Sequence, residues 1–403
     1  MTEQIPAPLP VAGIRLGCVA AGIRYQNRKD LVLVELAEGS TCAALFTRNQ
    51  FCAAPVKIAR EHLSVTRPRY LLINSGNANA GTGDAGLRDA VACCRTLAAL
   101  VGSSVEQVLP FSTGVIGEPL PVDRLTRALP EVLEALSGDG WLDAARAIMT
   151  TDTIAKFCSR QVVYEGKIFI VTGMAKGSGM IRPDMATMLA YIATDLAVET
   201  PLLQRALQCA VAPSFNSITV DGDTSTNDAC VLMATGLSQC TPLTDLESEL
   251  YPLFSTALNE VCMELALAIV RDGEGATKLV NILVEQALTA AEARDVAYTI
   301  AHSPLVKTAL FASDPNWGRI LAAVGRANVP ALVIEQVEIW LGDLCIVSGG
   351  GRAAGYNEAA GQAAMQHKEL TIRVVLGRGQ ASARVFTCDL SHEYVRINAE
   401  YRS

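Results

Sequence analysis

Histidine, aromatic residues and charge are all scarce in this sequence. Its 403 residues include four histidines, and only 5% are aromatic and 18% charged. His62, His302, His367 and His392 are isolated from one another and from any acidic ligand pattern, so neither a metal centre nor a Ser-His-Asp triad has support. Because the net charge is −8, the chain also lacks the basic surface that binds nucleic acid or an anionic membrane.

Targeting and redox signals are missing as well. The N-terminus has neither the basic start nor the apolar core of a signal peptide, and no apolar run approaches the length of a membrane span. A cytoplasmic protein is therefore expected. The twelve cysteines include no Cys-x-x-Cys pair and mostly stand in apolar contexts such as 91–94, which favours reduced, buried thiols over disulfides.

Apolar residues, in contrast, make up half of the chain. This is enough to fill a large core and to leave apolar surface for contacts between subunits. Strand patterns and amphipathic helices alternate along the sequence, without a repeat or a long linker. Together they predict an α/β layered sandwich, in which two sheets pack together and helices cover them.

The expected elements follow from periodicity and turn residues. Segments 74–83 and 112–117 are glycine-rich and are predicted as turns after strands; the first is either a tight structural turn or the wall of a site. Segment 313–320 is predicted to link a strand to a helix. Strands are expected at 31–36, 70–73, 107–111, 217–220, 279–284, 337–341, 370–376 and 383–388, hairpin turns at 165–166 and 377–379, and helices at 84–101, 122–136, 142–149, 202–211, 246–269 and 289–301.

An acidic, hydroxyl-rich segment occupies residues 217–228. Its carboxylates Asp221, Asp223 and Asp228 suggest a calcium loop, but the following glutamate of an EF-hand is missing. A wall of an active site or a solvated turn is the better interpretation.

One stretch, residues 176–195, joins a loop to a buried strand. Turn residues dominate 176–183 and apolar residues dominate 185–193, so Thr187 stands where the loop enters the strand. A threonine hydroxyl is a weak nucleophile until a base takes its proton, and the α-amino group of an N-terminal threonine can be that base. This requires cleavage between Ala186 and Thr187, which the hydroxyl can perform through an N-to-O acyl shift. An ordinary buried threonine at the start of a strand remains the alternative.

The block Lys176-Gly-Ser-Gly-Met, with Asp184-Met-Ala-Thr-Met-Leu-Ala190, resembles the self-cleavage site of the ornithine acetyltransferase family (glutamate N-acetyltransferase). Further blocks, such as 313–320, extend the resemblance over nearly the whole chain. The family has an αββα-like architecture and works as two α and two β chains. The resemblance therefore implies an α chain of residues 1–186 and a β chain of residues 187–403, interleaved in one body and assembled as a heterotetramer.

The resemblance also implies an activity. The acetyl group of N2-acetylornithine would pass to Thr187 and then to glutamate in a ping-pong cycle, giving ornithine and N-acetylglutamate in cyclic arginine biosynthesis. No cofactor is implied. Whether acetyl-CoA is a second donor, and whether arginine or ornithine inhibits the enzyme, stays open because no nucleotide-binding signature decides it.

Site residues follow from the same resemblance. Thr113 and Gly114 would form the oxyanion hole, where backbone N–H groups of a glycine turn can converge. Glu274 could engage the ammonium group of the substrate and Lys176 a carboxylate. Ser403 stands where family members commonly end in threonine, and it keeps the hydroxyl. The implied substrate contacts are Thr150, Lys176, Thr187, Glu274, Asn398 and Ser403.

Two other functions remain as alternatives. An amidase or aminopeptidase would use the same threonine chemistry but pass the acyl group to water. An uncleaved metabolite-binding or scaffolding protein would stay a single chain and form no acetyl-enzyme.

Overall fold

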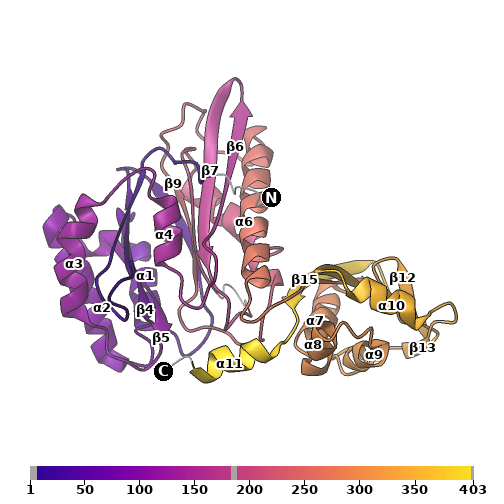
Figure 1. Ribbon diagram of the computed structural model, residues 1–403. Coiled ribbons are helices and arrows are strands. Elements are labelled where there is room, and N and C mark those ends of the chain that lie inside the picture. Colours follow the sequence, from indigo (N-terminus) through magenta and orange to yellow (C-terminus); the bar gives the residue numbers. More distant parts are fainter. Residues whose placement is uncertain (1–6, 183–187, 401–403) are drawn as a thin grey trace. The chain divides into compact units, whose positions relative to one another are not determined.

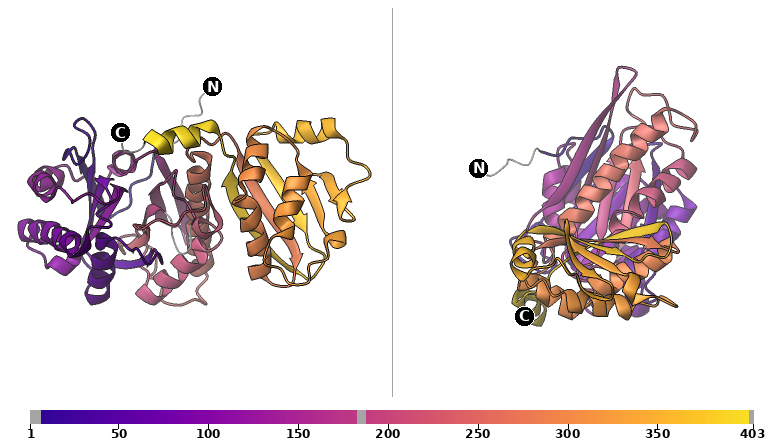
Figure 2. Two further views of the ribbon diagram at one scale, coloured as in Figure 1. Left: turned by 90° about the horizontal axis from the view of Figure 1, so that it is seen from below. Right: turned by 90° about the vertical axis from the view of Figure 1, so that its right-hand side faces the viewer.

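The computed structural model describes residues 7–182 and 188–400. These residues form two compact units, the first from 7–177, 188–216 and 224–269 and the second from 178–182, 217–223 and 270–400. Figures 1 and 2 show their helices and strands. Each unit contains residues from both sides of the predicted cut at 186/187, and the division into two chains at that bond stays a prediction.

Unit 1 contains two sheets. One has four strands in the order β1-β2-β4-β5, and the other has five in the order β3-β9-β8-β7-β6. β4 and β5 are parallel, as are β8 and β9, while the other neighbours are antiparallel. The strands are β1 (Ile14–Val19), β2 (Leu31–Leu36), β3 (Thr41–Phe46), β4 (Tyr70–Asn77), β5 (Val108–Val115), β6 (Lys156–Tyr164), β7 (Lys167–Lys176), β8 (Leu189–Thr194) and β9 (Ala229–Ala234).

Helices cover the outer faces of these two sheets, while one helix, α4, also packs in the core between them. The helices of this unit are α1 (Ala54–Val65), α2 (Gly83–Val101), α3 (Val122–Glu134), α4 (Trp141–Ala147), α5 (Thr200–Val211) and α6 (Leu250–Arg271). The last two residues of α6 belong to unit 2. Leu97 of α2 and Leu129 of α3 pack with Leu33 in a core on the outer face of the four-stranded sheet. α6 lies along the five-stranded sheet (Figure 2), where the absent side chain of Gly173 leaves room for Leu265.

The two sheets of unit 1 share the core between them. This core joins residues of β1, β2, β4 and β5 to residues of β7, β8 and β9. The rings of Phe111 and Tyr191, one from each sheet, meet edge to face with centroids 5.4 Å apart. The predicted sandwich of two packed sheets covered by helices is therefore confirmed in this unit.

β2 shows why a strand can be read from this sequence. Its residues Leu31–Leu36 are nearly all buried because one face meets the other sheet and the opposite face meets helices. A short apolar run is typical of a strand buried on both faces.

Unit 2 is built on one six-stranded sheet. Its order is β13-β12-β11-β14-β10-β15, and α7, α8, α9 and α10 contribute to its core. Side chains of Thr289, Ser303, Asn316 and Asn357 accept hydrogen bonds at the starts of these four helices, which fixes where each begins. The elements are β10 (Leu279–Ala287), β11 (Glu338–Leu341), β12 (Leu344–Ser348), β13 (Gly351–Arg352), β14 (Glu369–Val375), β15 (Ala381–Cys388), α7 (Ala290–Ala301), α8 (Pro304–Phe311), α9 (Trp317–Gly325), α10 (Glu358–Met365) and α11 (His392–Glu400).

Most predicted helices and strands form within a few residues of their expected bounds. The hairpin at 165–166 is confirmed: Tyr164 pairs with Lys167, and Glu165 and Gly166 both have positive φ, as a type I′ turn requires.

Several local predictions are wrong. β4 and β5 continue to Asn77 and Val115, so both glycine-rich segments begin as strand rather than turn. Residues 217–220 form no strand, and Ile218 makes only an isolated bridge to Phe386. Segment 313–320 follows helix α8 rather than a strand. Segment 377–379 closes no hairpin, because β14 and β15 both pair with β10 and lie on either side of it.

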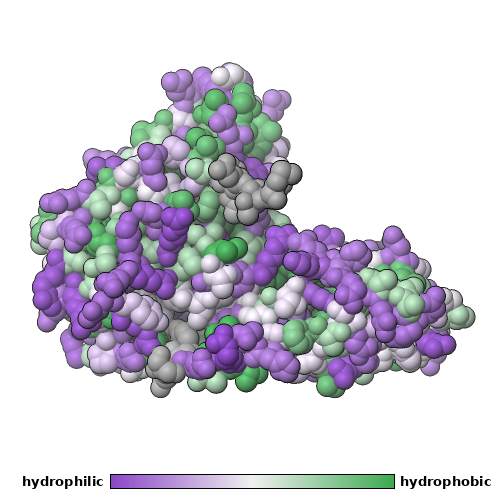
Figure 3. All heavy atoms as spheres, in the orientation of Figure 1, coloured by the Kyte–Doolittle hydropathy of each residue, from purple (hydrophilic) through white to green (hydrophobic). Residues whose placement is uncertain are grey.

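α6 is the one helix in the described ranges that is long and apolar enough to cross a membrane. Its residues Phe254, Leu258 and Leu265 are buried in unit 1, as expected for a core helix of a sandwich. At the β6–β7 hairpin, Val163 and Ile168 are 61% and 48% exposed, and hydrophobic side chains gather at that end of the unit in Figure 3.

Candidate active site

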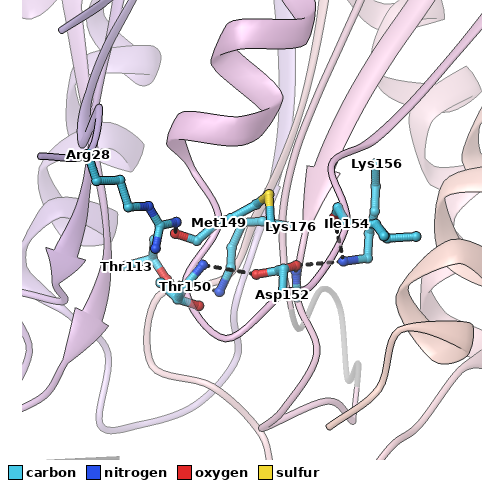
Figure 4. Close-up of polar contacts among 9 residues, drawn as sticks. Arg28, Thr113, Met149, Thr150, Asp152, Ile154, Lys156 and Lys176 are labelled. Carbon is cyan, nitrogen blue, oxygen red and sulfur yellow. Dashed lines mark hydrogen bonds and ion pairs between the residues drawn. The ribbon is translucent and has the colours of Figure 1, made fainter. Parts of the chain in front are cut away.

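Thr113 lies near the end of β5 and is buried, with 7% of its surface exposed. Lys176, the last residue of β7, donates a hydrogen bond from Nζ to Thr113 Oγ1 at 3.1 Å (Figure 4). The two residues are 63 positions apart in the sequence and belong to different sheets of unit 1. The structure thus brings together two residues that the resemblance assigns to the site.

Gly114 follows Thr113 in a conformation that only glycine adopts readily. Its φ is +133°, and a Cβ atom there would lie 2.3 Å from the carbonyl carbon of Gly76 on the neighbouring strand β4. Any side chain would force β4 and β5 apart. The glycine therefore lets the backbone turn beside Thr113 while the two parallel strands stay paired.

Asp152 is the centre of the polar cluster in Figure 4. Its carboxylate accepts hydrogen bonds from the backbone N–H groups of Thr150 at 3.0 Å and Gly177 at 2.7 Å. Lys156 Nζ donates to Asp152 Oδ1 at 2.7 Å, and both side chains are fully buried. Asp152 thus fixes the backbone beside Thr150 and the residue that follows Lys176.

The electrostatics of this cluster keep Asp152 ionised. Burial alone would raise the pKa of Asp152, but the ammonium groups of Lys176 and Lys156, with hydrogen bonds from Lys156 and the Thr150 amide, lower it to about 2. The Lys176 amino group thus lies near the Asp152 carboxylate and donates its hydrogen bond to Thr113.

Arg28 extends the cluster on the other side of Thr150. Its guanidinium donates a hydrogen bond to the carbonyl oxygen of Met149, immediately before Thr150 in the chain. Two hydrogen bonds therefore fix the backbone at Thr150: one from Arg28 to the preceding residue, Met149, and one from the Thr150 N–H group to Asp152.

Asp228 is a second buried acid in unit 1. It precedes Ala229, which pairs with Leu189 at the start of β8 and donates a hydrogen bond to the carbonyl of Met188 at 3.0 Å. Burial raises the pKa of Asp228 well above its ordinary value, and the Ser225 hydrogen bond and Lys176 charge oppose this only in part. Among the described residues no group donates to its Oδ2 atom. Burial thus favours the protonated form of Asp228, which lies next to the strand β8 that begins at Leu189.

In unit 2, Glu274 and Asn398 form a second group. Asn398 Nδ2 donates to Glu274 Oε2 at 2.7 Å and to the carbonyl oxygen of Tyr394 at 2.9 Å. Glu274 is 8% exposed and has no salt bridge to a described cation. Asn398 and Glu274, which are both predicted substrate contacts, are therefore joined by a hydrogen bond.

Three predicted positions lie outside the described residues: Ala186 and Thr187 at the cleavage bond, and Ser403 at the chain end. Their assignment stays a prediction. After Thr187, the described chain resumes at Met188, and β8 begins at Leu189.

The acidic segment 217–228 makes hydrogen bonds within the chain rather than a metal cage. Asp221 accepts from the N–H groups of Met180, Ile181 and Asp223. Over residues 7–182 and 188–400, no three His, Cys, Asp or Glu side chains stand close enough to hold a metal ion.

A cavity of about 450 Å³ in unit 1 lies away from these groups. It is lined by Ala234 at the end of β9 and by residues that follow β8 and β9 in the chain, including Val198 and Thr235. None of the predicted site residues lines it, so volume alone is a poor guide to the chemistry here.

The sequence-based prediction missed the role of Asp152 and its partner Lys156. Asp152 lies in a Thr-Thr-Asp-Thr segment, 150–153, where a carboxylate among hydroxyls after a helix is a usable signal. Nothing in the sequence marks Lys156, because a lysine near the start of a strand usually faces solvent.

Known proteins are similar to this chain over nearly its whole length. The model of the ArgJ family matches residues 15–403. A protein of Methylococcus capsulatus described as "Arginine biosynthesis bifunctional protein ArgJ" is 61% identical over 98% of this chain and 96% of its own length. One of Pseudomonas fluorescens with the same description is 55% identical over 99% and 98%. A crystal structure of ornithine acetyltransferase complexed with ornithine, from Mycobacterium tuberculosis, is 36% identical and covers 44% of this chain and 94% of its own, with a TM-score of 0.39.

Proposed function

The chain belongs to the ArgJ family, and we propose that it transfers the acetyl group of N2-acetylornithine to L-glutamate. Membership over residues 15–403, with relatives that match along their whole length, makes it an acyltransferase of arginine biosynthesis. The resemblance to ornithine acetyltransferases is thereby confirmed. Because its relatives are described as bifunctional, the proposal includes acetyl-CoA as a second acetyl donor.

The proposed nucleophile is Thr187, freed by cleavage after Ala186. Its hydroxyl attacks the acetyl carbonyl of N2-acetylornithine while its own α-amino group takes the proton. The tetrahedral intermediate collapses, the ornithine nitrogen leaves with that proton, and an acetyl ester remains on Thr187. The amine of glutamate then attacks the ester, which forms N-acetylglutamate and restores the hydroxyl.

The contact between Lys176 and Thr113 carries this proposal. This contact joins Thr113, a candidate for the oxyanion hole, to the amino group of Lys176. Thr187 follows Lys176 by eleven residues in the chain. A fixed donor set aimed at the developing negative charge is what acyl transfer requires. Asp152 supports the arrangement because it accepts a hydrogen bond from the N–H group of Gly177, the residue next to Lys176.

Substrate recognition is proposed for charged groups of each unit separately. In unit 1, Lys176 would attract a substrate carboxylate and Thr150 would contact the substrate through its hydroxyl. In unit 2, the Glu274 carboxylate would bind an ammonium group, and Asn398 and Ser403 would also contact the substrate. The 8% exposure of Glu274 supports this role, because a weakly solvated carboxylate gains more from a cationic ligand.

The remaining proposals concern assembly and setting. We propose a heterotetramer of two α chains (1–186) and two β chains (187–403) in the cytoplasm, acting without a bound cofactor or metal. The exposed Val163 and Ile168 support burial of the β6–β7 hairpin in an assembly, because apolar side chains gain from leaving water.

The test is the consumption of N2-acetylornithine with and without glutamate. The proposal expects strong acceleration by glutamate and N-acetylglutamate in an amount equal to the ornithine released. Release of acetate at a rate independent of glutamate would instead identify an amidase. An intact chain that forms neither product would favour a binding protein.

A further inference from the structure

Residues 178–182 lie just before the predicted cleavage bond but are bound within unit 2. The N–H group of Glu274 donates to the carbonyl of Ser178 at 2.8 Å, and that of Val220 donates to the carbonyl of Ile181 at 2.8 Å. Thr219 Oγ1 donates to the same Ile181 carbonyl at 2.8 Å. All three donors come after residue 187 in the chain. Cleavage at 186/187 would therefore leave the segment bound by residues of the β chain.

Asp221 holds the middle of this segment. Its Oδ2 accepts from the N–H group of Met180 at 2.6 Å, and its Oδ1 accepts from that of Ile181 at 2.9 Å. The hydroxyl of Tyr394 on α11 lies 3.3 Å from Oδ2 as a further donor. Two successive N–H groups that converge on one anion form a nest, and Met180 has the positive φ of +55° that such a turn needs. The charge on Asp221 thus stabilises a backbone shape that methionine adopts rarely.

Gly179 lies against the Glu274 carboxylate. A Cβ atom on Gly179 would lie 2.4 Å from Glu274 Cδ and 2.5 Å from each carboxylate oxygen. These distances are far shorter than any contact between such atoms, so a side chain at residue 179 and the present position of Glu274 exclude each other. Asn398 clamps the carboxylate with its 2.7 Å hydrogen bond to Oε2.

The residue after Glu274 fixes its backbone as well. Gly275 has a φ of +69°, and a Cβ atom there would lie 2.6 Å from the backbone nitrogen of Tyr394. Its carbonyl accepts a hydrogen bond from Ser391 Oγ at 2.6 Å. Gly275 therefore fixes the backbone next to Glu274. Because that backbone is fixed, the position of the Glu274 carboxylate depends on the residues at positions 179 and 398, which contact it.

We propose that Gly179 is a positioning residue for substrate binding. Because it has no side chain, it leaves the space that the Glu274 carboxylate occupies, and from there the carboxylate binds a substrate ammonium group. Asp221 sets the position of Gly179 by binding the two residues that follow it. This inference rests on the proposed role of Glu274 and adds the residues that define where that carboxylate lies. The ligand class is an amino acid with a cationic amine.

Gly179→Ala is a suitable perturbation because the clash is with the end of a flexible side chain. The φ of Gly179 lies outside the left-handed region, so alanine fits the backbone, and the three atoms nearest to its Cβ position all belong to the Glu274 carboxyl group. Gly355→Ala is the matched control, since Gly355 lies in the same unit with no atom within 4 Å of its Cβ position.

The expected result is a split between the two kinetic constants. Gly179→Ala should raise KM for N2-acetylornithine by about 10- to 100-fold, the range expected for losing a well-placed charged hydrogen bond, and change kcat less than about threefold. Gly355→Ala should match the parent in both constants. If Gly179→Ala equals the control, the inference is overturned.

Two further variants separate this inference from the proposed function. If Glu274→Gln leaves KM unchanged, the ammonium site itself is wrong; if it raises KM while Gly179→Ala does not, only the positioning role is wrong. In the double variant the positioning role predicts no rise beyond that of Glu274→Gln alone, whereas an unrelated structural defect would add its own loss. Should Gly179→Ala fail to fold, Asp221→Asn replaces it with an expected rise in KM of about 3- to 10-fold, and an unchanged KM refutes the role.

Discussion

Removing the charge of Asp152 should destabilise unit 1 more than any exposed substitution. The Asp152–Lys156 pair is fully buried, and the carboxylate also accepts two backbone N–H groups. Asp152→Asn removes the carboxylate that pairs with the buried Lys156 ammonium. Breaking a buried pair from one side costs about 3–5 kcal/mol of the free energy of unfolding.

The pKa of Asp152 gives a second measure of the same interaction. Its fall from 3.8 to about 2 on folding corresponds to about 2 kcal/mol, at 1.36 kcal/mol per unit. Because the folded pKa is depressed, this stability is present above pH 3.8 and is lost as pH falls toward about 2. This figure is smaller because it measures protonation of Asp152 with Lys156 and Lys176 in place, whereas the substitution removes the carboxylate from the buried pair at neutral pH.

Urea unfolding followed by circular dichroism measures the difference at neutral pH. Asp143→Asn is the control, since its pair with Lys29 is about half exposed on both sides and should change stability by about 1 kcal/mol or less. Combining Asp152→Asn with Lys156→Met should recover most of the loss, because the buried charge is gone. The reasoning is refuted if Asp152→Asn costs no more than Asp143→Asn, or if the double variant is as unstable as the single one.

Three further outcomes follow from the site and the second unit. Thr187→Ala should abolish both cleavage and acetyl transfer, and Thr187→Ser should keep part of both, as seen by gel and by product assay. Gly114→Ala should lower kcat by about 100-fold or more, because its Cβ would meet Gly76 and displace the oxyanion donors, and steady-state rates decide this. His302 has a pKa lowered to about 4, first by burial and then by Arg182 and Lys307, so its neutral form adds stability that is lost as pH falls from 6.5 toward 4. His302→Gln should flatten the pH dependence of the free energy of unfolding over that range, and an unchanged slope would contradict this origin.

The sequence was sufficient for the elements whose signals are local. β2 reads as a strand because its apolar run is buried on both faces, and the turn at 165–166 reads correctly because Gly166 suits a positive φ. The wrong predictions depended on partners distant in sequence. Residues 377–379 look like a hairpin turn, but β10, about ninety residues earlier, takes the place between the two strands. Likewise β5 continues past Gly114, because β4 supplies a parallel neighbour.

The candidate site shows the same limit. Resemblance supplied Thr113, Lys176 and Glu274, and the structure then joined Thr113 to Lys176 through one hydrogen bond. It could not supply Asp152 or Gly179, whose roles depend on contacts across 25 and 95 residues of chain. Gly179 carries no local pattern that marks its role, and the one local signal for Asp152 is its position among threonine hydroxyls after a helix.

The acetyl-threonine intermediate is the central claim, and intact mass after mixing with N2-acetylornithine alone tests it most directly. We expect two chains of about 20 and 23 kDa, in proportion to their lengths within 42.7 kDa. The larger should gain about 42 Da, at its N-terminal Thr187, and lose it when glutamate is added. A single chain that still transfers acetyl groups, or a processed chain whose acetyl group lies elsewhere, would contradict the account.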